Sequence, residues 1–450
     1  MSKQYRSYQP NQCYLLPPSL DEWLPQDHLA RFVNEVVDEL DLSTIYASYE
    51  EEMRGYPPYH PAMMVKVLVY AYAIGVYSSR KIERRIQEDI AFRYLAAGNF
   101  PDFRTINAFR KRHLKEFQGL FKQVLQLCRK AGLVKLGTIA VDGTKMKANA
   151  SIHKAMSYGR MKKEEARLQA EVDELMRQVE QVNTREDKRF GDCRGDELPK
   201  ELAFRETRLA KIREAKQALE AEAKARAEAE AKAKEGTDSN DHTDPPTGEP
   251  PISVDEKAQR NFTDPDSRVQ KAAKTFIQGY NVQVAVDAET QVIVGTVVRT
   301  SSADVDAFSA VLDQVEELVG TPDRVVADAG YYSQKNVDEA RRRHIAPFIP
   351  PNKIKHSEWC RAKAKGPSPK APRERMARFL RTKRGREIYR LRQESVEPVF
   401  GQIKEARGFR HFSLRGHTSV TAEFALVAVV HNLLKLYRQQ VGTLKVAAKA

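Results

Sequence analysis

The sequence is poor in cysteine and tryptophan, and no long apolar run stands near its start. Its four cysteines lie far apart and form no Cys-x-x-Cys pair, so neither a zinc ribbon nor a disulfide framework is expected, and a reducing compartment fits. They are Cys13, Cys128, Cys193 and Cys360. Residues 1–20 lack the apolar segment of a signal peptide, and the apolar stretch 63–77 is too short to span a bilayer. We therefore expect a cytoplasmic protein with no membrane partner.

Acidic residues are too few to balance the basic ones, with 75 Lys and Arg against 61 Asp and Glu and a formal net charge of +14. Residues 1–60 carry 4 basic and 10 acidic side chains, and residues 61–136 carry 15 and 5. Residues 341–450 carry 26 and 7. Two separate basic blocks indicate a protein that grips a polyanion, above all nucleic acid, at two places. A merely solvated basic surface is the alternative.

An all-helical domain is expected over residues 20–136, after an N-terminal arm of residues 1–19. Apolar side chains at helical spacing predict helices over 63–77, 79–90 and 102–127. The last of these is basic and carries Arg104, Arg110 and Arg112, which suits a helix-turn-helix-like DNA-binding domain. A plain helical cap on another domain is the alternative.

Residues 152–235 are expected to form a helical, coiled-coil-like insertion. Two runs of apolar residues follow heptad spacing on either side of a break at 191–199, which predicts a helical hairpin that packs on itself or on a copy. The seam residues are Leu168, Val172, Leu175, Val179, Val182, Leu202, Leu209, Ile212 and Leu219. Residues 236–275 are a return segment whose first part, 236–251, is a low-complexity linker predicted to be disordered.

Signals for β-strands lie on both sides of this insertion. Strands are expected at 138–141, 280–286, 291–299, 324–327 and 346–349, and helices at 303–319, 333–343, 384–407 and 418–440. With the insertion left out, three strands precede the first helix and strands then alternate with helices. That order fits an α/β, ribonuclease-H-like core with a mixed sheet, built from 137–151 and 276–436 and followed by a basic tail at 437–450.

Two aspartates follow strands of this predicted core. Asp142 ends the first strand, and Asp328 ends the strand after the first helix. If the two strands are neighbours, both carboxylates reach one edge of the sheet, where α/β proteins bind ligands. A simple turn at either position is the alternative, since Ser333 caps a helix directly after Asp328.

Glu397 is the best third acid, and Glu394 competes with it one helical turn away. Pro398 means either that a helix begins there or that a longer helix is kinked there. Three carboxylates suit a pair of Mg²⁺ ions, which stabilise charge on the attacking and leaving oxygens of a phosphodiester.

Six stretches of the chain resemble the DDE transposases of bacterial insertion sequences, in the branch with an all-helical N-terminal domain before the catalytic core. The stretches are PDFRTINAFRKRH (101–113), VDGTKMKANAS (141–151), GYNVQVAVD (279–287), ADAGYYS (327–333), VEPVFGQIK (396–404) and RGFRHFSLRG (407–416). They occur in family order over most of 20–436, and the segment 152–275 is only partly covered.

The resemblance implies that Asp142, Asp328 and Glu397 are a catalytic, metal-binding triad in a ribonuclease-H-like core. It implies Mg²⁺ or Mn²⁺, with two ions per active site and no small-molecule cofactor. It further implies an enzyme that binds the terminal inverted repeats of its own element, cuts the DNA there and joins the freed 3′-hydroxyl to target DNA. The partners would be double-stranded DNA and further copies of the chain, in a dimer or larger assembly on the bacterial nucleoid.

The family also has an arrangement of Tyr, two residues, Arg, three residues, Glu, six residues and Lys. Tyr389, Arg392, Glu397 and Lys404 match it, except that four residues separate the arginine from the glutamate. The glutamate-to-lysine spacing selects Glu397 over Glu394. The resemblance implies that Arg392 and Lys404 contact DNA phosphates near the cleaved bond, and we expect Tyr389 and Arg407 to contact DNA as well.

Two other functions are compatible with parts of the sequence. A tyrosine recombinase would use Tyr389 or Tyr437 as a nucleophile and would need no metal, although the paired aspartates argue against it. A DNA-binding protein with an inactive DDE core is the second. Trp359 is expected either to stack on an unpaired base or to be an ordinary packed aromatic.

Overall fold

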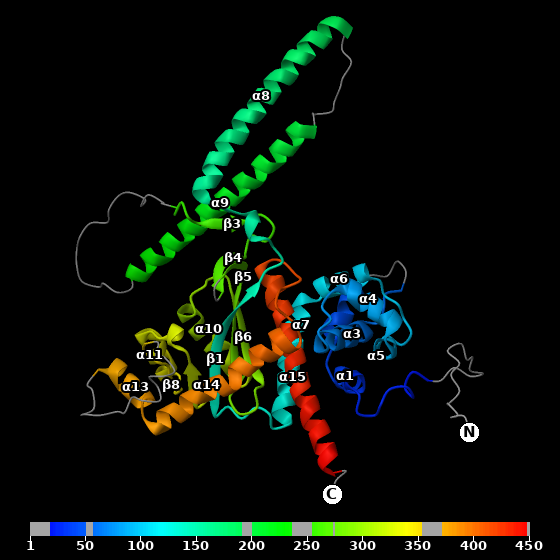
Figure 1. Ribbon diagram of the computed structural model, residues 1–450, viewed down its shortest axis with the longest axis vertical. Coiled ribbons are helices and arrows are strands. Elements are labelled where there is room, and N and C mark those ends of the chain that lie inside the picture. The colour runs from blue at the N-terminus through cyan, green and yellow to red at the C-terminus, as the bar shows by residue number, and fades with distance from the viewer. Residues whose placement is uncertain are drawn as a thin grey trace, which may run out of the picture.

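The computed structural model describes residues 19–50, 57–190, 200–235, 254–272, 275–352 and 371–447. A helical N-terminal domain, a core built on a sheet, and a long projecting helical hairpin make up this part of the chain (Figure 1). Cys128 is a buried free thiol. The predictions for the low-complexity linker, for Trp359 and for the other three cysteines fall outside the described residues.

The N-terminal domain consists of short helices. They are α1 (Leu29–Asp38), α2 (Ser43–Glu50), α3 (Pro61–Ala73), α4 (Ser79–Glu88), α5 (Ile90–Leu95), α6 (Phe103–Arg112) and α7 (Leu114–Lys130). Residues 102–127, expected as one helix, form two, because His113 leaves helical geometry and buries its ring against Phe109 and Tyr49. Likewise α4 stops before Asp89, whose side chain caps α5 by accepting a hydrogen bond from the Ala91 amide.

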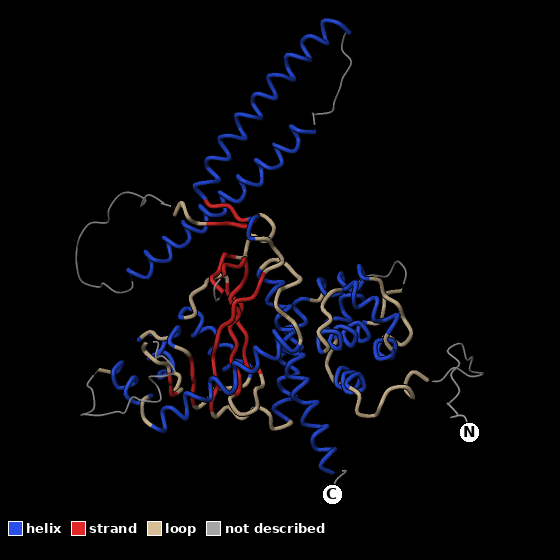
Figure 2. The backbone as a smooth tube through the Cα atoms, viewed as in Figure 1, coloured by secondary structure: helices blue, strands red, loops and turns tan. Residues whose placement is uncertain are grey.

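The core is a mixed sheet in the order β4-β5-β1-β7-β8, with β6 paired to β5 (Figure 2). Its strands are β1 (Thr138–Lys147), β4 (Arg268–Ala272), β5 (Thr275–Asp287), β6 (Ile293–Arg299), β7 (Arg324–Ala327) and β8 (Ala346–Phe348). β4, β6 and β1 pair antiparallel with β5, whereas β1, β7 and β8 run parallel. The predicted mixed sheet is therefore present, although four of its strands, not three, precede the first core helix.

Two parts of the sheet differ from the prediction. β1 does not end at Asp142: residues 142–147 continue the strand because they pair with residues 279–284 of β5. Only the parallel partner β7 stops, at Ala327 beside Val141. The return segment also supplies β4 to the sheet, and β3 (Gln259–Asn261), which pairs with β2 (Ala155–Ser157) at the foot of the hairpin.

Helices cover the sheet and its β6 edge. They are α10 (Phe308–Leu318), α11 (Gln334–Arg342), α13 (Pro372–Leu380), α14 (Lys383–Gly401) and α15 (His417–Ala447), with short turns η1 (Ile152–Lys154), η2 (Val305–Ala307), η3 (Ala329–Tyr331) and the π-helical η4 (Gln402–Ala406). α14 contacts β1, β5 and β7, and α10 contacts β5 and β6. The amide of Asn432 in α15 bonds both backbone groups of Ile293, which closes the edge of β6.

By length and composition α15 is the one described helix that passes for a membrane span, over His417–Val441. It contacts α7, α3 and β6, and 78% of its most apolar window is buried inside the protein. Its apolar character is therefore accounted for by its place in the core. It also continues through the predicted boundary between core and tail at 436.

The insertion is a hairpin of α8 (Tyr158–Phe190) and α9 (Lys200–Glu235), which run antiparallel (Figure 1). It has its own apolar cluster, separate from the main core, which includes Leu168, Leu209, Ile212 and Leu219 of the predicted seam. Val172 is buried and Leu175 half-buried. The side chains of Val179, Val182 and Leu202 lie outside the described residues. The two helices of one chain thus pack on each other.

A buried polar cluster joins the helical domain to α15, and Arg110 belongs to it. Tyr72 accepts a hydrogen bond from Arg110 at 3.0 Å and donates one to the carboxylate of Glu423 at 3.1 Å. The Arg110 and Glu423 side chains are 5% and 0% exposed. The prediction that Arg110 contacts DNA is therefore wrong for this structure, since its guanidinium balances a buried carboxylate.

Arg407 has a similar internal role in the joint. Its guanidinium donates to the Gln402 carbonyl and lies 3.1 Å from His431, and burial lowers the pKa of Arg407 to about 10. Its carbonyl accepts a hydrogen bond from Tyr77. Gly75 has φ +81° and an added Cβ would lie 2.5 Å from the same carbonyl oxygen, so only glycine fits there. Arg407 is half-buried, and its contact with DNA stays a prediction.

Replacing Arg110 should destabilise the protein, because Glu423 would remain buried without its cation. We expect Arg110→Met to lower the free energy of unfolding by about 3 kcal/mol, the usual cost of breaking a buried ion pair. Lys111→Met, an exposed neighbour on the same helix, should change it by less than about 0.5 kcal/mol. Thermal unfolding of both variants measures the difference. Equal melting midpoints would contradict the claim that Arg110 compensates the buried negative charge of Glu423.

Candidate active site

The parallel pairing of β1 with β7 places Asp142 and Asp328 side by side. Val141 and Ala327 are register partners, and each aspartate is the next residue of its strand. Neighbouring strands lie about 4.8 Å apart, so the two side chains leave the sheet close together. Asp328 then caps the η3 turn, accepting a hydrogen bond from the Gly330 amide at 2.7 Å. The two predicted acids therefore meet where β7 ends.

Arg392 of α14 connects this pair to the third acid. Its Nη1 lies 2.6 Å from Oδ2 of Asp142 and its Nη2 lies 3.1 Å from Oε1 of Glu397. The Arg392 side chain is only 12% exposed, and its Nε has no hydrogen-bond partner among the described residues. Burial opposes the charged guanidinium, but the carboxylates outweigh it and raise the pKa of Arg392.

Glu397 and Glu394 lie in different surroundings. Glu397 pairs with Arg392, whereas Glu394 forms an exposed ion pair with Arg390 on its own helix. The helix begins at Lys383 and contains Pro398, so the longer-helix alternative is the correct one. Because proline has no amide hydrogen, the Glu394 carbonyl is released from the helix ladder, and it accepts a hydrogen bond from the Gln291 side chain at 3.0 Å.

Lys404 reaches the same strand from the π-helical turn η4. Its ammonium group hydrogen-bonds the Thr144 hydroxyl and lies 3.1 Å from the Lys145 carbonyl oxygen. Burial lowers the pKa of Lys404. Thr144 is two residues beyond Asp142 and so lies on the same face of β1. The lysine is therefore at the acidic site, although its cation is bonded to the strand.

The two candidate tyrosine nucleophiles are both engaged. Tyr389 is half-buried, its ring lies 5.9 Å from the Arg392 guanidinium carbon, and burial raises its pKa. Tyr437 donates a hydrogen bond to the Asp27 carbonyl at 2.6 Å and stacks near Phe32. Tyr389 is thus part of the acidic site, and Tyr437 belongs to the packing of α15 against α1.

Arg104 and Arg112 are exposed on α6, away from the interior position of Arg110. The Arg112 guanidinium lies over the ring of Tyr49 at 4.5 Å from its centroid. Arg104 lies 5.6 Å from the ring centroid of Phe103. Both side chains lie at the surface of the helical domain, and Arg112 also donates a hydrogen bond to the Ser48 carbonyl.

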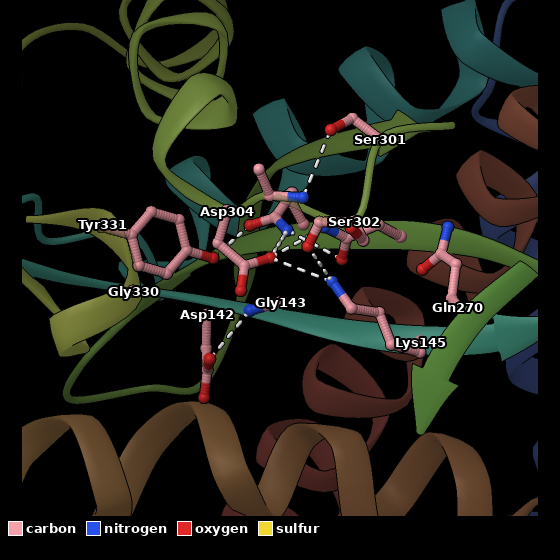
Figure 3. Close-up of polar contacts among 12 residues, drawn as sticks. Asp142, Gly143, Lys145, Gln270, Ser301, Ser302, Asp304, Gly330 and Tyr331 are labelled. Carbon is pink, nitrogen blue, oxygen red and sulfur yellow. Dashed lines mark hydrogen bonds and ion pairs between the residues drawn. The ribbon is translucent and has the colours of Figure 1, made fainter. Parts of the chain in front are cut away.

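On the opposite face of β1 lies a polar network that the sequence reasoning missed (Figure 3). Oδ1 of Asp304 accepts hydrogen bonds from Asn281 and Gln283 at 2.8 Å each and pairs with Lys145 at 3.2 Å. Gln283 also accepts a hydrogen bond from Tyr331, just after Asp328. The network ties β5 to the turn that carries Asp328.

A signal for this network existed in the sequence. Asn281 and Gln283 alternate with apolar residues in a strand whose two faces are both buried. Buried amides need partners, so polar residues at every second position of such a strand mark a polar site on that face. Gly143 permits the arrangement, because an added Cβ would lie 2.4 Å from Nε2 of Gln283. Figure 3 shows that Asp142 points from β1 toward α14, on the side away from this network.

Asp142 is the acid whose electrostatics are most altered. Burial raises its pKa to about 6, the Arg392 guanidinium and the Gly143 amide oppose that rise, and Asp328 and Glu397 add to it. A carboxylate in such surroundings needs a nearby cation to stay ionised at neutral pH. Arg392 supplies one positive charge to three carboxylates.

The chemistry of this set of side chains fits a divalent cation. Mg²⁺ prefers carboxylate oxygens, and the site has an excess of negative charge over the single guanidinium. Among the described residues, no group of three or more His, Cys, Asp or Glu side chains is already arranged to hold a metal ion. Arg392 stands between Asp142 and Glu397 instead.

Two family models match the chain. Residues 18–112 match the family described as Transposase domain (DUF772), and residues 241–433 match the family described as Transposase DDE domain. These families define an enzyme of the transposase class, which acts on DNA. The chain belongs to the DDE transposases of insertion-sequence type.

The second match covers Asp328 and Glu397 but not Asp142, which the insertion separates from the rest of the core. A DDE transposase domain implies a ribonuclease-H-like fold, and the mixed sheet is consistent with it. The family generally uses divalent metal ions. No curated protein and no solved structure matches the chain.

The raised pKa of Asp142 predicts a pH-dependent stability difference in metal-free buffer. The folded protein holds this proton up to about pH 6, whereas the ordinary pKa is 3.8. The stability gained from the bound proton is therefore present below pH 3.8 and lost as the pH rises through 6. Asp142→Asn cannot lose it, so its stability relative to wild type should increase by about 2.4 kcal/mol from pH 4 to pH 7.5.

Denaturant unfolding in EDTA at the two pH values measures this difference. Asp306→Asn, an exposed aspartate of the same core, should show no such change and serves as the control. A constant offset between Asp142→Asn and wild type at both pH values would mean that Asp142 is not buried as described.

Proposed function

We propose that this transposase binds the terminal inverted repeats of its insertion sequence and catalyses metal-dependent cleavage and strand transfer of DNA. The observation that carries the proposal is the meeting of Asp142 on β1 with Asp328 directly after the parallel strand β7, and the link from Asp142 to Glu397 through Arg392. Three acids that lie far apart along the chain are thus brought together where α14 crosses β1 and β7.

Asp142, Asp328 and Glu397 would hold two Mg²⁺ or Mn²⁺ ions. When bound, such ions stabilise charge on the attacking and leaving oxygens of a phosphodiester. The residues themselves provide the carboxylate oxygens, and the side of the site away from the sheet remains for a DNA phosphate. The raised pKa of Asp142 means that a cation there also favours its ionised form.

Arg392 would exchange partners when the site is loaded. Its guanidinium occupies the space between Asp142 and Glu397 and has an unpaired buried Nε, so it is positioned to turn toward a phosphate oxygen once cations neutralise the acids. Lys404, whose pKa is lowered by burial, and Tyr389 lie on the same helical segment and would contact the same DNA strand.

DNA recognition would involve the helical domain as well. Arg104 and Arg112 are exposed on α6, and residues 61–136 carry 15 basic and 5 acidic side chains. Such a surface attracts the phosphate backbone. Because both ends of an element must be processed, we expect the chain to act as a dimer or larger assembly on DNA, with no small-molecule cofactor and with a cytoplasmic, nucleoid-associated location.

Removing any one of the three acids should abolish cleavage of DNA that carries the element ends. We expect Asp142→Asn, Asp328→Asn and Glu397→Gln each to lower the cleavage rate by about a thousandfold or more, because metal-ion stabilisation of a transition state amounts to several kcal/mol. Glu394→Gln is the matched control on the same helix and should retain activity. End cleavage and strand transfer on oligonucleotides provide the measurement; persistent metal-dependent activity in all three variants would refute the triad.

Metal binding should also be visible without catalysis. Because three carboxylates repel one another, Mn²⁺ should raise the melting midpoint of the wild type at pH 7.5, by the equivalent of about 2.7 kcal/mol at 100 times the dissociation constant. Asp142→Asn and Glu397→Gln should lose most of this shift, and Glu394→Gln should keep it. A shift of equal size in all four proteins would place the metal elsewhere.

The alternative of a DNA-binding protein with an inactive core makes the opposite prediction. Such a protein would bind the element ends and leave them uncut at any metal concentration. No contact in the described residues favours it over the catalytic proposal, since all three acids are present and two of them, Asp142 and Glu397, are linked through one guanidinium.

A further inference from the structure

A pocket of about 470 Å³ lies at the foot of the helical hairpin, on structure that the catalytic proposal does not use. It is formed by η1, β2, the first turn of α8, one side of α9 and the residues that follow β3. Its lining includes four basic side chains and, among the described residues, no carboxylate. The basic side chains are Lys154, Arg160, Arg208 and Lys211.

Three of these four cations differ from the cations that join α8 to α9. Elsewhere α8 and α9 are joined by ion pairs, such as Arg205 with Glu171 and Lys216 with Glu165, both at 3.0 Å. Lys154, Arg160 and Lys211 form no side-chain hydrogen bond or ion pair within the described part of the chain. Positive charge therefore gathers in the pocket without an internal partner.

Arg208 is the exception among the four and shows why the others stay unpaired. It pairs with Glu164, the nearest acid on the facing helix, at 3.1 Å. Glu164 is already shared with Arg167 at 2.6 Å. Arg160 interacts with the Glu164 carboxylate only through longer-range electrostatic attraction. The local acids are thus committed, and the remaining cations are left for an external anion.

The same pocket presents aromatic surface. Phe204 on α9 is 67% exposed, although it lies on a highly charged helix, and the ring of Phe262 lines the opposite part of the pocket. A large apolar side chain that is exposed to water to this degree has an unfavourable hydration free energy. A ligand that covers the ring removes this cost. Unpaired bases stack on such rings, while neighbouring cations bind the strand's phosphates.

We propose that this pocket binds an unpaired nucleotide of a DNA strand, with its base on Phe204 and its phosphates at Lys154, Arg160 and Lys211. The inference rests on the proposed DNA-processing function and adds a second DNA site, on the insertion. An aromatic ring together with unpaired cations in a concave site favours a single-stranded segment over a duplex, because the bases of a duplex are already stacked. A pocket of this volume is of the order needed for one nucleotide.

Binding of the full-length chain to labelled DNA tests the proposal in EDTA, where cleavage plays no part. The probes are a blunt duplex and the same duplex with an unpaired tail of about five nucleotides, one of them 5-iododeoxyuridine for photocrosslinking. We expect tighter binding of the tailed DNA by the wild type and a crosslink to Phe204. Phe204→Ala should weaken tailed-DNA binding about tenfold and leave the blunt duplex unaffected, and Phe204→Tyr should restore it.

Charge is tested separately from stacking. Lys154→Ala with Lys211→Ala should reduce the slope of log affinity against log salt by about 1.4 for the tail-dependent binding, since each phosphate contact on a single strand contributes about 0.7. Lys163→Ala with Lys224→Ala removes two exposed cations of the same helices that do not line the pocket, and should leave that slope unchanged.

Several results would overturn the proposal. They are equal binding of tailed and blunt DNA by the wild type, no effect of the pocket variants, and a change of oligomeric state in Phe204→Ala without loss of tail binding, which would identify a second copy as the occupant. Competition by free dTMP as strong as by the tail would identify a free nucleotide instead. Failure here with cleavage intact leaves the triad standing, whereas a wild type that binds neither DNA contradicts the proposed function itself.

Discussion

A single buried guanidinium holds the acidic site together. Asp142 lies where burial alone would protonate it, with Asp328 and Glu397 adding negative charge, and Arg392 lies between two of these acids with both of its terminal nitrogens engaged. Unpaired buried charges cost several kcal/mol each, so the acids and the arginine depend on one another. The local structure of the core places Arg392 at the end of β7, beside these acids.

The position of α14 across the sheet is what places Arg392 there. The helix crosses β1, β5 and β7, and it continues through Pro398 because the carbonyl that the proline leaves unpaired is taken up by Gln291. It then widens into the π-helical η4, which brings Lys404 to β1 beside Thr144. On the other face of β1, Asp304 and its amide partners fix the turn that carries Asp328. The site is thus held from both faces of one strand.

Much of the core was predictable from the sequence, because its strands and helices have regular apolar periodicity and because an aspartate follows each of two strands. The order of elements left the pairing of β1 with β7 as a condition, and the parallel register of the two strands meets it. The length of β1 could not, since residues 142–147 stay in the strand only through pairing with β5. The same holds for β4, whose strand character comes from its partner more than from its own residues.

The side chains show where sequence reasoning fails. Arg110 belongs to the same basic helix as Arg104 and Arg112, yet it is buried against Glu423, and the half-buried Arg407 lies against His431 in the joint between domains. Periodicity on α6 did not reveal this, because the partner of Arg110 lies more than three hundred residues away. The link of Arg392 to Asp142 is equally non-local, whereas its contact with Glu397 is made within α14 across the four-residue spacing.

The most direct test of the central claim is an anomalous diffraction map of crystals grown with a DNA end and Mn²⁺, using a form of the enzyme that retains all three acids. The expected result is Mn²⁺ bound to oxygens of Asp142, Asp328 and Glu397, with Arg392 turned from the acids toward a DNA phosphate. Ordered DNA in the complex with no Mn²⁺ at these acids, and Arg392 still between Asp142 and Glu397, would contradict it.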